Sequence, residues 1–88
     1  MKVIFSSSFK RALRRRVKRN PDLEAIFIKK LEAFQKNPND PELRTHKLKG
    51  DLAGFRAFSI SHDLRVIFEI TPEGHALFSD IGTHKDVY

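Results

Sequence analysis

The sequence predicts an α+β fold, in which an N-terminal strand and an antiparallel helical hairpin precede an antiparallel β-meander. Three observations support this prediction. Apolar residues recur at helical spacing in the first half of the chain, and beyond Gly54 they alternate with a period of two. Clusters of Asn, Pro, Asp and Gly separate the segments. This order places both helices on one face of the sheet, in a single domain expected to span residues 1–88.

The N-terminal segment is expected to form a strand that leads into a basic helix. Residues 1–5 are rich in β-formers, and a run of serines ends the pattern. Ser7 or Ser8 is then expected to cap the helix. Most of the helix surface is Lys and Arg, so the apolar stripe is narrow and consists of Phe9, Ala12, Leu13 and Val17.

A second helix should follow at once, because Asn20 and Pro21 both stop the first helix and start another. Asn20 is expected to be its cap and Pro21 its first residue. The helix should run to about Gln35 or Lys36 and form a hairpin with the first. Lys30 is the one polar interruption among its regularly spaced apolar residues, which are Leu23, Ile26, Phe27, Leu31 and Phe34.

The second half of the chain is expected to form the meander. Residues 37–41 read as a turn, and the segment up to Gly50 is expected to be an ordered loop with Leu48 as its apolar anchor. Three strands should follow, at residues 55–60, 64–70 and 75–81.

Composition narrows the classes of function. The absence of Cys excludes disulfides, thiolate catalysis and cysteine-based metal sites. A formal net charge of +6 favours an anionic partner, which is nucleic acid or an acidic protein and, less favoured, a membrane surface. The N-terminal apolar segment is too short for a signal peptide, and no run of apolar residues is long enough to cross a membrane. A soluble cytoplasmic protein without a membrane partner is therefore expected.

The remaining candidate chemistry is acid–base catalysis without a cofactor. No two of the four histidines have the i,i+4 spacing of a helical metal site, and no Gly-rich phosphate loop is present. RNA can be cleaved without a metal, because its own 2′-hydroxyl attacks the neighbouring phosphate once a base removes the proton. Such a site needs a base, an acid for the departing 5′-oxygen, and positive charge on the phosphate. Histidine and Arg or Lys supply these groups.

The predicted topology brings part of such a set together. Arg65 interrupts an otherwise apolar strand near its start, and the next strand runs antiparallel to it. Residues 82–88 should therefore emerge beside Arg65, which brings His84 near Asp63 and Arg65. The pattern alone does not place His46.

Four motifs, taken in their order and spacing, are similar to the RelE/ParE toxin superfamily, particularly its YafQ-like branch of bacterial toxin–antitoxin systems. The resemblance covers essentially the whole chain. It implies an mRNA endonuclease that often acts on message in the ribosome and is held inactive by a cognate antitoxin protein. The motifs are His46-x-Leu48-x-Gly50, Gly54-Phe55-Arg56, residues 63–68 (Asp-Leu-Arg-Val-Ile-Phe) and residues 81–88 (Ile-Gly-Thr-His-x-x-Val-Tyr).

The same resemblance implies roles for individual residues. His46 and His84 match the catalytic histidines, Asp63 an acidic partner, Arg65 a phosphate-binding arginine and Tyr88 a terminal aromatic residue. The cations expected to bind RNA are Lys47, Lys49, Arg56 and Lys85.

The chain departs from the YafQ-like pattern at two positions. Ser59 stands where such enzymes can carry a further histidine, and Leu64 stands where they can carry a tryptophan. Both departures bear on how the chemical roles are divided.

Other interpretations stay open at this point. The scaffold in ParE-like members acts on DNA gyrase, and a non-catalytic member would bind only RNA or its antitoxin. His84 can be a solvated surface residue, Asp63 a turn residue and Tyr88 a packed ring. The basic first helix suits RNA phosphates, an acidic antitoxin segment, or simple solubility.

Overall fold

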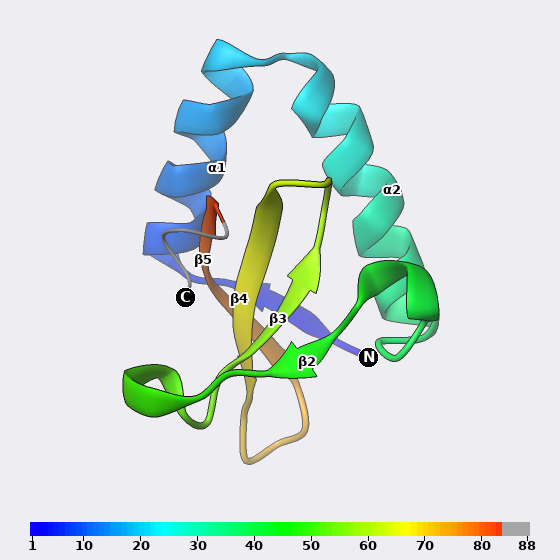
Figure 1. Cartoon of the computed structure of the whole chain (residues 1–88), viewed down its shortest axis with the longest axis vertical. Coiled ribbons are helices and arrows are strands. Elements are labelled where there is room, and N and C mark those ends of the chain that lie inside the picture. The colour runs from blue at the N-terminus through cyan, green and yellow to red at the C-terminus, as the bar shows by residue number, and fades with distance from the viewer. Residues whose placement is uncertain (84–88) are drawn as a thin grey trace.

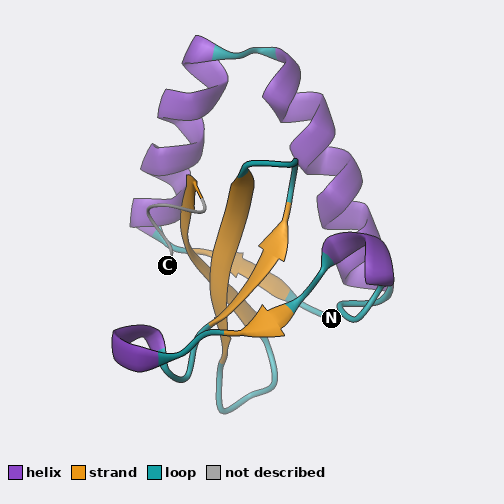
Figure 2. Cartoon of the chain, viewed as in Figure 1, coloured by secondary structure: helices purple, strands orange, loops and turns teal. Residues whose placement is uncertain are grey.

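In the computed structural model, which describes residues 1–83, two helices pack on a five-stranded sheet (Figures 1 and 2). Two short 3₁₀ turns, η1 (Pro41–Leu43) and η2 (Gly50–Leu52), flank the edge strand β2. The helices and strands are β1 (Val3–Phe5), α1 (Ser7–Arg19), α2 (Asp22–Lys36), β2 (His46–Lys47), β3 (Arg56–Ser59), β4 (Leu64–Ile70) and β5 (Ala76–Thr83).

The sheet has the strand order β1-β5-β4-β3-β2. β3, β4 and β5 form the antiparallel meander that the sequence predicts. β1 pairs with β5 in parallel, so the sheet is mixed, and β2 adds an antiparallel edge strand beside β3. Figure 1 shows α1 and α2 as a hairpin whose connection lies beyond the β3–β4 turn, at the same end of the molecule. The predicted α+β architecture, with both helices on one face, is confirmed.

The start of α1 differs by one residue from the prediction. Ser6, rather than Ser7 or Ser8, is the cap: its backbone is extended, and its hydroxyl accepts a hydrogen bond from the Phe9 amide at 3.1 Å. The hydroxyl of Ser8 instead donates to the Ser79 carbonyl at 2.8 Å. Ser79 is the extra residue of a bulge in β5, because Ile67 pairs with Asp80 and the next residue pairs with Phe78. The helix start is therefore fastened to the bulge.

The start of α2 also differs in detail. Asn20 ends α1, and its backbone carbonyl accepts from the Leu23 amide at 3.0 Å. Pro21 takes the cap position and α2 begins at Asp22, without a side-chain cap. The start of α2 is therefore held by a backbone hydrogen bond to Asn20 and not by a side-chain cap.

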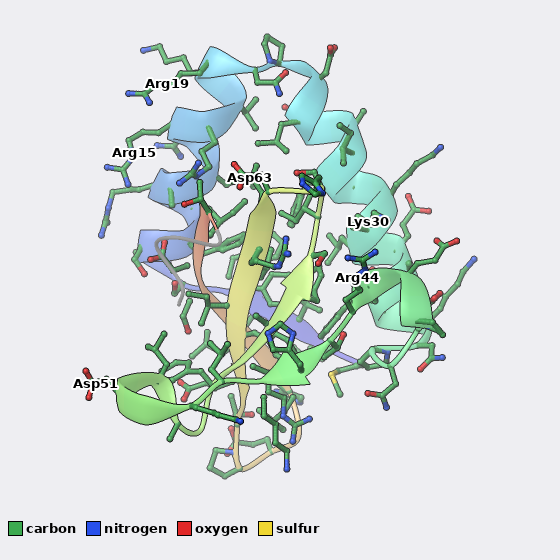
Figure 3. All side chains as sticks on the ribbon, in the orientation of Figure 1. Arg15, Arg19, Lys30, Arg44, Asp51 and Asp63 are labelled. Carbon is green, nitrogen blue, oxygen red and sulfur yellow. The ribbon has the colours of Figure 1, made fainter. Side chains whose placement is uncertain are left out.

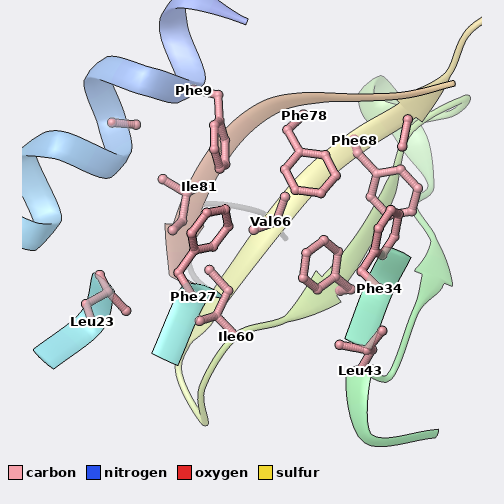
Figure 4. Close-up of a cluster of buried hydrophobic side chains, with 13 residues drawn as sticks. Phe9, Leu23, Phe27, Phe34, Leu43, Ile60, Val66, Phe68, Phe78 and Ile81 are labelled. Carbon is pink, nitrogen blue, oxygen red and sulfur yellow. The ribbon is translucent and has the colours of Figure 1, made fainter. Parts of the chain in front are cut away.

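Six phenylalanines form the centre of the core (Figure 4). The Phe34 ring stacks on Phe58 with centroids 4.8 Å apart and meets Phe68 and Phe78 edge-on at 5.0 and 5.3 Å. Phe9 and Phe27 complete the set from α1 and α2. Such rings interact favourably beyond the area they bury. The cluster therefore ties both helices to β3, β4 and β5.

The predicted loop of residues 37–50 contains more structure than expected. Leu48 is buried as predicted, in a small cluster with Ala57 and Ile67 on the sheet face away from the helices. Leu43 is a second anchor, fully buried in the helix-side core. On α2, Ile26 is exposed and lies outside the core stripe to which the spacing assigned it. None of the helices within residues 1–83 is long and apolar enough to cross a membrane.

Phe34→Ala should lower the free energy of unfolding by about 3–5 kcal/mol, because it leaves a cavity at the junction of helix and sheet. Urea denaturation measures this change. Ile28→Ala on the same helix is the control, since Ile28 is 45% exposed and should cost far less. Equal losses in the two variants would contradict this description of the core.

Candidate active site

Register places His46 and Arg65 on the same face of the sheet, the face away from the helices. His46 pairs with Ala57, which pairs with Ile67 on β4; two residues along β3, Ser59 pairs with Arg65. Residues paired directly across strands share a face. Ideal strand spacing and rise put the Cα atoms of His46 and Arg65 about 12 Å apart. We call this surface the open face.

A hydrogen bond fixes the orientation of the His46 ring. Nδ1 lies 2.9 Å from the carbonyl oxygen of Arg44. A carbonyl can only accept, so Nδ1 carries the hydrogen, and the neutral ring has its lone pair on Nε2. His46 is exposed on the two-residue strand β2. In this tautomer the basic nitrogen of the ring is Nε2.

The residue that holds His46 has a left-handed backbone. Arg44 has φ 51° and ψ 42° at the end of η1, and it is the only non-glycine residue with positive φ among residues 1–83. A non-glycine residue in this region costs about 1–2 kcal/mol. The turn brings the Arg44 carbonyl to the ring and directs the chain into β2.

The guanidinium of Arg65 is fastened to the β3–β4 turn. Its Nη1 donates to the carbonyls of Ser61 at 3.2 Å and of His62 and Leu64 at 3.3 Å each. All three bonds use one nitrogen, which leaves the rest of the donor fork for another acceptor. Arg65 is half-buried, so its side chain is held at the turn rather than extended into solvent.

Arg65 lines a pocket of about 300 Å³ at the edge of the open face. β2 pairs with Arg56 and Ala57 only, so the Ser59 end of β3 has no neighbouring strand. Figure 3 shows Arg44 and Lys30 beyond this edge. The polar residues that line the pocket are Lys30, Glu42, Arg44, Ser59, Ser61, His62 and Arg65.

Asp63 lies on the other side of the same turn. It lines a pocket of about 550 Å³ between the turn and the C-terminal half of α1. Three arginines of α1 line that pocket as well, and Figure 3 shows Asp63 on the side of the turn that faces Arg15 and Arg19. The turn thus separates the Asp63 carboxylate from the pocket that contains Arg65.

The other predicted cations are placed around β2 and β3. Lys47 pairs with Arg56, which pairs with Phe68, so strand alternation directs Lys47 and Arg56 away from the open face. Lys49 is exposed at the start of η2, one residue beyond the buried Leu48. These cations surround the edge of the sheet rather than converge on one point.

The predicted residues His84, Lys85 and Tyr88 lie outside the described residues. Within those residues, Gly82 pairs with Arg65 and Thr83 pairs with Leu64, beside Asp63. β5 therefore reaches the end of the sheet where Asp63 and Arg65 lie, as the topology predicts.

Sequence reasoning missed Lys30 and Arg44 as members of a site. Lys30 left a signal, because it is the one polar interruption of the apolar stripe of α2. Arg44 left none, since its position depends on a left-handed backbone that no sequence pattern indicates. Among residues 1–83, no group of three or more His, Cys, Asp or Glu is arranged to hold a metal ion.

Solved structures of bacterial toxins share this fold. YafQ in the Escherichia coli DinJ–YafQ complex has a TM-score of 0.73 and 20% identity, covering 99% of this chain and 97% of that chain. A YoeB/ParE toxin from Agrobacterium tumefaciens has a TM-score of 0.77 and 16% identity, with 96% and 99% coverage. A metal-bound toxin from Helicobacter pylori has a TM-score of 0.75 and 24% identity, with 100% and 99% coverage. No curated protein sequence matches the chain.

These likenesses define the fold as that of the RelE-like toxins. The family model described as the bacterial toxin of type II toxin–antitoxin systems, YafQ, matches residues 1–88. The chain therefore belongs to the YafQ family and is the toxin component of a type II toxin–antitoxin system.

Arg65→Ala should lower the free energy of unfolding by about 1–2 kcal/mol, because it removes three hydrogen bonds from the β3–β4 turn. Hydrogen exchange of the amides of residues 61–64 should become faster. His46→Ala is the comparison variant, measured by the same denaturation and exchange experiments. Its exposed ring should contribute under about 0.5 kcal/mol to the free energy of unfolding. An unchanged stability for Arg65→Ala would show that the turn does not depend on the guanidinium.

Proposed function

We propose that this toxin is an endoribonuclease that cleaves mRNA by attack of the 2′-hydroxyl on the neighbouring phosphate, without a metal ion. The observation that carries the proposal is that His46 and Arg65 lie on the same face of the sheet, the open face. The His46 ring has Nδ1 bonded to the Arg44 carbonyl, and the Arg65 guanidinium lies farther along the same face. A proton acceptor and a fixed cation on one surface are two of the three groups that the reaction needs.

His46 and His84 share the proton transfers in this mechanism. One takes the proton of the 2′-hydroxyl, and the other gives a proton to the departing 5′-oxygen. The geometry favours His46 Nε2 as an acceptor. The assignments of His84, of Asp63 as its partner and of Tyr88 as a substrate-orienting ring rest on the family resemblance.

Positive charge stabilises the phosphate as it becomes more negative. Arg65 supplies it from within the sheet, on the open face itself. The assignment of Lys47, Lys49 and Arg56 to RNA binding rests on the family resemblance, and these cations lie around β2 and β3. Charge of this kind is most effective where it is fixed before the reaction starts. The three hydrogen bonds of Arg65 to the turn meet that condition.

The proposed partners follow from the family and from charge. YafQ of Escherichia coli has been solved in complex with DinJ, and we propose a cognate antitoxin for this chain as well. The net charge of +6 suits both an acidic antitoxin segment and mRNA on the ribosome. The site of action would then be the cytoplasm.

His46→Ala and His84→Ala should each lower the rate of RNA cleavage by about 10²–10⁴-fold, the usual contribution of a general acid or base. Cleavage of a translated mRNA and of a free oligoribonucleotide, each with the purified toxin, measures the effect. His75→Ala is the matched control, because His75 lies at the β4–β5 turn and does not line the pocket that contains Arg65.

Cleavage at the wild-type rate in both His46→Ala and His84→Ala would overturn the site assignment. Inhibition of DNA supercoiling by a toxin that leaves RNA intact would overturn the proposed reaction and favour action on gyrase.

A further inference from the structure

The hydroxyl of Ser59 is buried without a partner at the edge of the open face. Ser59 is 8% exposed, and its Oγ is the one buried side-chain polar atom without a hydrogen bond among residues 1–83. Burial of an unpartnered hydroxyl is unfavourable, so such a group calls for an explanation. Ser59 lines the pocket of about 300 Å³ that also contains Arg65.

The surroundings of this hydroxyl are cationic. Lys30 from α2, Arg44 from the end of η1 and Arg65 from β4 line the pocket, against one carboxylate, that of Glu42. His62 adds an imidazole from the β3–β4 turn. Ser59 and Arg65 are direct cross-strand partners, so their side chains start about 5 Å apart on the same face.

We propose that this pocket is a phosphate subsite, in which Ser59, Lys30 and Arg44 hold a backbone phosphate of RNA next to the reacting nucleotide. The inference deepens the proposed ribonuclease function and rests on it. Arg44 connects the two places: its carbonyl holds the His46 ring, and its side chain lines the pocket. A nucleotide reacting at His46 would therefore place an adjacent phosphate over Ser59.

The chemistry of the pocket favours a phosphate over an acidic protein segment. A docked helix or strand would need an apolar surface. The one large apolar residue that lines the pocket is Ile60, and it is only 1% exposed, so it offers no such surface. The volume is at the lower end of the ~300–1,000 Å³ range of ligand sites, which suits a phosphate with part of its sugar. Arginine forks and a lysine point charge are the usual phosphate ligands.

Binding of a non-cleavable oligonucleotide, substituted with 2′-O-methyl groups, separates this subsite from the chemistry. Lys30→Gln should weaken binding by about threefold and Arg44→Gln by about fivefold, as for partly exposed charge contacts. In each variant, the slope of log Kd plotted against the logarithm of the salt concentration should fall by about 0.7. Lys29→Gln is the matched control: it removes the same charge from the same helix, but Lys29 is exposed and does not line the pocket.

Ser59→Ala and Glu42→Gln test the same subsite without the loss of a cation. Ser59→Ala should weaken binding by about threefold or more while the Tm does not fall, because the lost hydroxyl has no partner in the protein. Glu42→Gln should strengthen binding by about twofold, since it removes a like charge that faces the phosphate. Inorganic phosphate, titrated against the amide signals of residues 59–62, tests whether the pocket binds a free phosphate or needs the RNA chain.

The results distinguish the two proposals. Wild-type cleavage of RNA, together with unchanged binding in Lys30→Gln and Ser59→Ala, would overturn the subsite alone. An equal loss in Lys29→Gln and Lys30→Gln would also overturn it, because general electrostatic attraction would then account for both. If the wild type neither cleaves nor binds RNA, the ribonuclease function fails and the subsite fails with it.

Discussion

The phenylalanine cluster between helices and sheet determines what the opposite face presents. Phe58, Val66, Phe68 and Phe78 must point to the helices, and strand alternation then directs Ser59 and Arg65 to the open face. If a strand shifted by one residue, its core-facing and open-face side chains would exchange places. The apolar core therefore specifies the strand register strongly. The candidate active site is therefore a consequence of core packing, although no phenylalanine of the cluster lies on the open face.

The segment between α2 and β3 completes the site at the edge of the sheet. Leu43 anchors it to the helix-side core and Leu48 to the small cluster on the open face. Between these anchors, the left-handed Arg44 turns the chain so that its carbonyl meets His46. Because β2 is only two residues long, it leaves the Ser59 end of β3 uncovered. A longer edge strand would close the pocket.

The spacing of apolar residues predicts the helices and strands well, because it reflects which face of each element is buried. The bounds of β4 were predicted without error, and those of α1, α2, β3 and β5 within two residues. Long-range pairings were harder: the parallel contact of β1 with β5 and the strand β2 depend on tertiary packing. For the same reason the pattern placed Arg65 beside β5 but left His46 unplaced, and the pocket around Ser59 became visible only with the fold.

The most direct test of the central claim uses an RNA with a single 2′-deoxy nucleotide at the cleavage site, in the presence of a metal chelator. If the 2′-hydroxyl is the nucleophile, the toxin should cut the all-ribose strand with chelator present, leave a 2′,3′-cyclic phosphate and a 5′-hydroxyl, and fail to cut the substituted strand. Cleavage of the 2′-deoxy strand at that position, or a requirement for a divalent metal, would contradict the account.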